Sequence, residues 1–122
     1  MKPPAFIDSL PSDFIQNIRL AFGEESQRWL ERLPELLNQA AQRWNLVVGK
    51  PFLLSYNYVC AATQKDGRKV VLKIGFPNPE LTGEINALRL YDGQGACRVL
   101  ESDAGLGMLL LERLHPGTML VS

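Results

Sequence analysis

A lysine and a glutamate near the middle of the chain are the residue types best placed to do chemistry. Lys73 ends the short apolar run that starts at Val70, a run typical of a β-strand. Glu84 lies in the helical pattern that follows the Gly75–Pro79 break. A strand lysine can offer its ammonium to phosphate oxygens, and a helix carboxylate beside it can hold that ammonium in place. The pair therefore indicates an anion-binding lysine with an orienting carboxylate.

The alternation of side chains along a strand decides what Lys73 shares a face with. Val71 and Lys73 point to one face, and the residues that point to the other are Val70, Leu72 and Ile74. On a cleft-lining face, the ammonium can reach phosphate oxygens while Val71 packs on a base. The alternative is a solvated lysine at a sheet edge, and the strand alone does not decide between the two.

The helix expected from Pro79 to about Asp92 offers two carboxylates as partners for Lys73. Its apolar face comprises Leu81, Ile85, Ala87, Leu88 and Tyr91. Glu84 lies next to that face, in the middle of the helix, and can point toward the strand. Glu80 is a rival in the first turn, where the helix dipole already accounts for a carboxylate. We therefore expect Glu84 to be the partner.

The N-terminal third of the chain has the pattern of helices. Ser12 is a suitable N-cap for a first helix that stops at Gly23. A second helix is expected from Glu24 to Leu33 and a third from Pro34 to Trp44, because proline suits the first turn of a helix. We interpret these helices as a structural cap without a direct chemical role.

The remaining elements are expected to be strands. Phe52 to Gln64 predicts two strands that meet near residues 55–57, and the Asp66-Gly67 pair predicts a tight hairpin into Lys69–Ile74. Two further strands are expected at 98–102 and 108–114. The predicted fold class is α+β: an antiparallel sheet of about five strands with one glutamate-bearing helix, preceded by a helical N-terminal cap. The expected domains are 1–46 for the cap, 47–114 for the sheet lobe and 115–122 for a linker.

Composition excludes several classes of partner. The 122 residues include 13 basic and 13 acidic side chains with no basic run, so no nucleic-acid partner is expected. No apolar stretch approaches the roughly 20 residues of a membrane span, and no signal peptide is recognised, so a cytoplasmic location is expected. The chain has no CxxC motif and one histidine, His115, so no metal site is expected. Cys60 and Cys97 are expected to be free thiols.

The order of these parts resembles the aminoglycoside phosphotransferase branch of the protein-kinase-like fold. Within it, the chain is most similar to the streptomycin 6-kinase and hydroxyurea phosphotransferase group. The segments that carry the resemblance are Gly23–Pro34, Trp44–Leu46, Asp66–Lys73, Glu84–Ala96 and Leu109–Gly117. The resemblance covers nearly the whole chain and implies the N-terminal lobe of an enzyme that transfers phosphate from ATP to a hydroxyl group of a small molecule.

The resemblance also implies roles for single residues. Lys73 would bind the α- and β-phosphates, and Glu84 would orient it. Val71 would lie against the adenine ring, whose edge would contact the backbone of Glu112, Arg113 and Leu114. The turn that contains Ser55 and Asn57 would stand in for the loop over the phosphates, although it lacks the glycines of the protein-kinase loop.

No catalytic residue is expected in this chain, because no catalytic loop precedes Ser122. Magnesium would accompany ATP, with its ligands in a second lobe. His115 is interpreted as a linker residue. The alternative function is a non-catalytic α+β binding or interaction module that keeps the lobe shape. An apolar strip from Met108 to Leu120 is expected to favour self-association, and the acceptor that is phosphorylated stays open.

Overall fold

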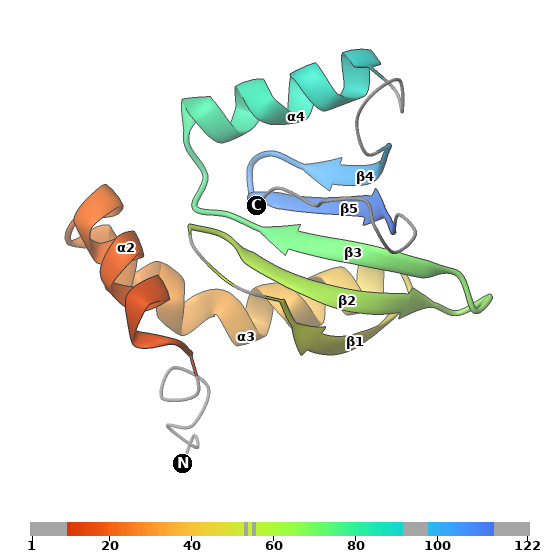
Figure 1. Cartoon of the computed structure of the whole chain (residues 1–122), viewed down its shortest axis with the longest axis horizontal. Helices are drawn as coiled ribbons and strands as arrows, with labels where there is room; N and C mark the ends of the chain where they lie inside the picture. Colours follow the sequence, from red (N-terminus) through yellow and green to blue (C-terminus); the bar gives the residue numbers. More distant parts are fainter. Residues whose placement is uncertain (1–9, 53, 55, 92–97, 114–122) are drawn as a thin grey trace.

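The structure, a computed structural model, describes residues 10–52, 54, 56–91 and 98–113. Two helices, α2 (Ser12–Phe22) and α3 (Glu25–Arg43), precede strands β1 (Leu46–Pro51), β2 (Tyr58–Gln64) and β3 (Lys69–Ile74). Helix α4 (Pro79–Tyr91) and strands β4 (Val99–Asp103) and β5 (Met108–Glu112) follow. The strands form one antiparallel sheet in the order β1-β2-β3-β5-β4, so the predicted α+β class is confirmed (Figure 1).

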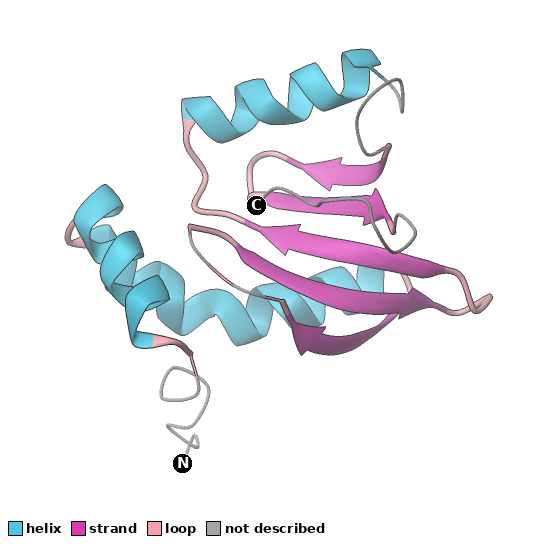
Figure 2. Ribbon diagram, viewed as in Figure 1, coloured by secondary structure: helices cyan, strands magenta, loops and turns pink. Residues whose placement is uncertain are grey.

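The helices lie on opposite faces of this sheet. Arg43 of α3 forms an ion pair of 2.6 Å with Asp103, which is paired with Met108 and shares its face. Arg89 of α4 donates to Ser102 Oγ at 2.6 Å, and Ser102 points to the opposite face. In Figure 2, α3 crosses behind the sheet and α4 runs beside β4. None of the helices within the described residues has the length and apolar character needed to cross a membrane.

Helix α2 begins and ends close to the predicted residues, but its cap differs. Pro11 rather than Ser12 occupies the N-cap position, and no side chain caps the helix there. Gly23 ends the helix as predicted, with φ of 65° and its N–H donating to Arg19 O at 2.9 Å. A positive φ is costly for residues with a Cβ, which is why a glycine suits this position.

The prediction of two helices separated at Pro34 is wrong, because α3 runs unbroken through it. Proline removes one N–H from the helix ladder, but the apolar stripe continues on both sides of it. Leu30, Leu33, Leu36 and Ala40 are all buried, whereas Pro34 is exposed. Burial of this stripe against the sheet therefore outweighs the missing hydrogen bond.

The prediction of a strand starting at Phe52 is also wrong, because β1 spans Leu46–Pro51. This strand contains Gly49, Lys50 and Pro51, which lower its intrinsic strand propensity. Because β1 pairs only with β2 in the described sheet, it is an edge strand, where proline is tolerated. Pairing with β2, from Leu46 opposite Gln64 onward, sets its position.

One hydrophobic core extends through cap and sheet. Its fully buried side chains come from α2, α3, β2, β3 and β5 and include Phe14, Ile18, Leu30, Leu33, Leu72, Ile74, Met108 and Leu110. The part of the expected apolar strip from Met108 to Leu111 is 0–7% exposed, so it is not bare as predicted. Residues 114–120 of that strip lie outside the described part of the chain, and self-association stays a prediction.

Candidate functional site

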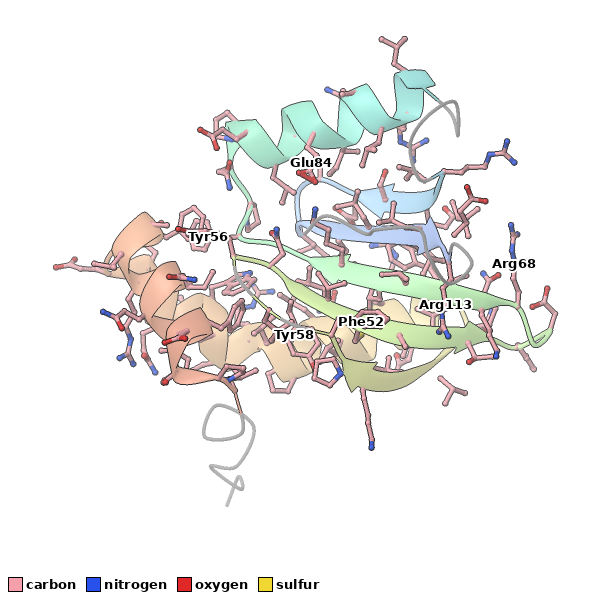
Figure 3. The ribbon with its side chains drawn as sticks, in the orientation of Figure 1. Phe52, Tyr56, Tyr58, Arg68, Glu84 and Arg113 are labelled. Carbon is pink, nitrogen blue, oxygen red and sulfur yellow. The ribbon has the colours of Figure 1, made fainter. Side chains whose placement is uncertain are left out.

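Lys73 and Glu84 are joined by a short ion pair. Lys73 Nζ donates to Glu84 Oε1 at 2.6 Å. The lysine side chain is 4% exposed and that of the glutamate 42% exposed, so the pair lies where the sheet meets solvent. Figure 3 shows Glu84 projecting from α4 toward the sheet. The predicted partner is therefore the one present, and the rival Glu80 lies exposed in the first turn of α4.

The start of α4 is held by a side-chain cap that places Glu84 one turn further on. Asn78 Oδ1 accepts a hydrogen bond from Leu81 N at 3.1 Å, and Pro79 occupies the first helical position. Leu81 and Ile85 are buried, and they fix the inward face of the helix. The predicted apolar face is correct in these two residues and in the half-buried Leu88, whereas Ala87, predicted on that face, is exposed, and the side chain of Tyr91 is not among those described.

The ammonium of Lys73 sits on an apolar sheet face. Its cross-strand neighbours are Val59 on β2 and Leu109 on β5, both buried. Glu84 is its one hydrogen-bond acceptor among the described residues, and an ammonium has three hydrogens to donate. A charge in such surroundings favours further anionic partners, because little water competes with them.

A cleft of about 730 Å³ opens beside Glu84. It is bounded by the end of α2, the turn before β2, and the segment that leads from β3 into α4. Its lining residues are Ala21, Phe22, Tyr56, Asn57, Phe76, Asn78, Pro79, Glu80, Leu81 and Glu84. The sequence patterns singled out Glu84, Glu80 and the turn with Asn57, but they did not predict that these residues line one cleft with the end of α2, because its walls come from three separate segments.

The turn predicted to cover the phosphates reaches this cleft through Asn57. Its amide lies over Gly75, where an added Cβ would come 2.5 Å from Asn57 Oδ1. Gly75 directly follows β3, so Asn57 lies near the strand end that carries Lys73. Gly75 also donates its N–H to Gly107 O at 2.8 Å, which brings the β4–β5 turn close. Ser55, the other predicted residue of this turn, lies outside the described residues.

Val71 shares the face of Lys73, as the alternation predicts, but it is only 1% exposed. Its neighbours across the strands are Ala61 and Leu111. The side chain of Val71 is therefore not accessible to an adenine ring in this structure.

The end of β5 makes contacts that the sequence did not predict. The Glu112 amide donates to Arg98 O at 3.1 Å, and its carboxylate accepts from Arg98 N at 3.1 Å. Arg113 donates to two backbone carbonyls, Ala62 O at 2.9 Å and Val70 O at 3.1 Å. The Glu112 amide is thus engaged within the sheet, and the Arg113 side chain spans β2 and β3. Leu114 lies outside the described residues.

Two titratable groups of β2 have shifted pKa values. Burial raises the pKa of the Cys60 thiol to about 12, and burial also raises the pKa of the Tyr58 hydroxyl, with a smaller contribution from Cys60. Cys60 is a free thiol, as predicted, and such a pKa keeps it unreactive at neutral pH. Cys97 lies outside the described residues. No group of three His, Cys, Asp or Glu side chains in the described ranges could hold a metal ion.

A five-stranded antiparallel sheet whose central strand carries a lysine paired with a helix glutamate is the arrangement of a kinase-like N-terminal lobe. The family model for aminoglycoside/hydroxyurea antibiotic resistance kinases matches residues 43–122. The chain therefore belongs to this family.

Similar proteins extend the match to the helical cap. Streptomycin 6-kinase of Streptomyces glaucescens is 33% identical over 114 residues, which is 93% of this chain and 37% of that protein. Hydroxyurea phosphotransferase of Kitasatospora aureofaciens is 36% identical over 88% of this chain and 32% of its own length. Streptomycin 6-kinase of Streptomyces griseus is 30% identical over 93% of this chain and 37% of its own length. The chain thus spans about a third of the length of these relatives. No solved structure was found to match it.

Proposed function

We propose that this chain is the ATP-binding lobe of a phosphotransferase that phosphorylates a hydroxyl group of an antibiotic-like small molecule. The acceptor is an aminoglycoside such as streptomycin, or hydroxyurea, the compounds named in its relatives. The observation that carries the proposal is the 2.6 Å pair between Lys73 and Glu84 beside the cleft. Magnesium would accompany the nucleotide, held by ligands outside the described residues.

The hydrogen-bond donors of the Lys73 ammonium suit the phosphates of a nucleoside triphosphate. The ammonium has one acceptor among the described residues and lies on an apolar face, so phosphate oxygens can take its other hydrogens. Glu84 fixes its position from α4, and the side chain of Asn57 lies at the same strand end. Bound ATP would supply the phosphoryl group, while Lys73 would stabilise negative charge on its phosphates.

The test is an isothermal calorimetric titration of the 122-residue chain with ATP up to millimolar concentrations, carried out with and without Mg²⁺. Lys73→Ala is expected to weaken binding about tenfold or more, since a hydrogen bond to a charged group is worth about 1.5–3 kcal/mol. Lys69→Ala is the matched control: it is a lysine of the same strand and face, but it is exposed.

Two results would overturn the proposal. One is a chain that is folded by circular dichroism and does not bind ATP, a result that would favour the non-catalytic interaction module. The other is an equal affinity for ATP in Lys73→Ala and Lys69→Ala, which would remove Lys73 from the site.

A further inference from the structure

Two phenylalanines join the helical cap to the segment that leads into α4. Phe22 is the last residue of α2, and Phe76 lies between β3 and α4. Their rings are stacked, with centroids 4.3 Å apart and planes 10° from parallel. The Trp29 ring of α3 is 6.1 Å from that of Phe76 and tilted by 59°. We call Phe22 and Phe76 the aromatic clamp.

The aromatic clamp is connected to the first turn of α4 by hydrogen bonds. Phe76 O accepts from Asn78 Nδ2 at 2.7 Å, and Asn78 Oδ1 accepts from Leu81 N at 3.1 Å. Glu84 follows Leu81 by one helical turn. A displacement of Phe76 would therefore shift Asn78, which caps the N-terminus of α4, and with it the first turns of the helix that carries Glu84.

Few side chains hold α4 on the sheet, so the hydrogen bonds from Phe76 to its first turn contribute to its position. Leu81 and Ile85 are the buried side chains of its apolar face, and Leu88 is half-buried. Arg89 ties the far end of the helix to Ser102 through exposed hydrogen bonds. The end nearer to Glu84 is held by Leu81, the Asn78 cap and the stacked rings.

We propose that the aromatic clamp positions Glu84 against Lys73. Phe22 and Phe76 are then positioning residues. The helical N-terminal cap, composed of α2 and α3, therefore helps to set the geometry of the Lys73–Glu84 pair in addition to packing on the sheet. The consequence for nucleotide affinity rests on the function proposed above, whereas the effect on α4 does not.

Amide hydrogen exchange of the 122-residue chain, read on peptides from 75–91, tests the clamp without nucleotide. Phe22→Ala is expected to speed exchange in these peptides about two- to tenfold, while β2 and β3 stay protected. That range corresponds to the ~0.5–1.5 kcal/mol of a stacked aromatic pair. Leu20→Ala, at a residue of α2 that is 78% exposed, is expected to leave exchange unchanged.

Further variants separate positioning from general stability. Leu36→Ala removes a core side chain of α3 and is expected to destabilise the whole fold without a selective effect on 75–91. Phe22→Tyr keeps the ring and is expected to restore slow exchange. If Phe22→Ala does not fold, Phe22→Leu keeps apolar volume without the ring and takes its place. Unchanged exchange in 75–91, or an equal rise in all peptides, would overturn the inference.

Nucleotide titration of the same variants distinguishes this inference from the proposed function. Weaker ATP binding by Phe22→Ala, rescued in Phe22→Tyr, supports both. Faster exchange in 75–91 together with no ATP binding by the parent chain supports the clamp and contradicts the proposed function. ATP binding that depends on Lys73 but has the same affinity in Phe22→Ala contradicts the clamp as a positioning device and leaves the proposed function standing.

Discussion

The Lys73 ammonium differs from an ordinary surface lysine in what surrounds it. Only 4% of its side chain is exposed, and its strand neighbours are apolar. An exposed ion pair contributes little, because water and salt screen it. A nearly buried ammonium is costly without a partner, and Glu84 supplies one at 2.6 Å. Glu84 therefore offsets the cost of burying the Lys73 charge, and the anion-binding role proposed above depends on the hydrogens of the ammonium that Glu84 does not accept.

The two carboxylates of α4 allow this role to be assigned by mutation. Glu84→Gln is expected to weaken ATP binding by the chain about tenfold, because the charge that fixes Lys73 is lost. Glu80→Gln is the matched control, since Glu80 is exposed and lines the same cleft. Calorimetric titration of both variants measures the difference. A loss of affinity in Glu80→Gln alone would show that the orienting carboxylate has been wrongly assigned.

The Arg43–Asp103 pair predicts an acid dependence of stability. The hydrogen bond from Arg43 lowers the pKa of the Asp103 carboxyl below its ordinary 3.8, and the backbone amide of Leu106 contributes in the same direction. A lowered pKa in the folded state stabilises the fold above the unfolded pKa, and this contribution is lost as pH falls through the folded pKa. Asp103→Asn is therefore expected to cost at most about 1 kcal/mol at pH 7.

Urea unfolding of the parent chain and Asp103→Asn at pH 7 and at pH 3 or below measures this contribution. The difference between them should shrink as the pH falls below about 4. A difference that is the same at both pH values would mean that the asparagine acts through packing and not through the charge.

Residue-level prediction worked where local geometry decides. Alternation along β3 placed Val71 and Lys73 on one face, and helical spacing put Glu84 beside the apolar face of α4. It did not anticipate the stacking of Phe22 on Phe76, because that contact depends on how α2 packs in three dimensions. The engagement of the Glu112 amide was missed because it depends on the register in which β5 pairs with β4.

At the scale of elements, strong local signals were correct and weak ones were not. The β2–β3 hairpin follows from the Asp66-Gly67 pair, and Gly67 has φ of 90°. The edge strand β1 was misplaced because its position depends on pairing with β2 and not on its own composition. Helix α3 was divided at Pro34 because propensity was given more weight than the apolar stripe that continues past it.

A substitution at Pro34 measures how much the low helix propensity of proline costs α3. Pro34→Ala is expected to stabilise the chain by about 1–3 kcal/mol, because alanine restores an N–H donor and has the higher helix propensity. The side chain is exposed, so little packing is lost. Urea unfolding of the two proteins gives the difference, with Gln39→Ala as a control at another non-core position of the same helix. Destabilisation would show that the backbone shape imposed by proline is needed for α3 to pack on the sheet.

At the scale of the whole molecule, cap and sheet share one core. Phe14 of α2, Leu33 of α3 and Leu72 of β3 are all 0% exposed and belong to the same cluster. The expected division into a cap of residues 1–46 and a lobe of 47–114 thus describes the order of elements along the chain. The two parts bury apolar side chains against each other.

The 122-residue chain produced alone is therefore expected to fold cooperatively and to phosphorylate nothing. One continuous core predicts that circular dichroism and tryptophan fluorescence report a single urea transition. Phosphoryl transfer needs a base for the acceptor hydroxyl and carboxylates for magnesium. The described residues offer no cluster able to bind a metal, and the relatives are about three times longer.

A coupled assay of ATP consumption with streptomycin and with hydroxyurea tests the activity, and gel filtration tests the self-association that was predicted from the sequence. Lys73→Ala is the control that separates turnover by the chain from a contaminating kinase. Turnover that disappears in Lys73→Ala would show that these 122 residues carry their own catalytic groups. Two separate unfolding transitions would show that the helical cap and the sheet are independent units, which the shared burial of Phe14, Leu33 and Leu72 argues against.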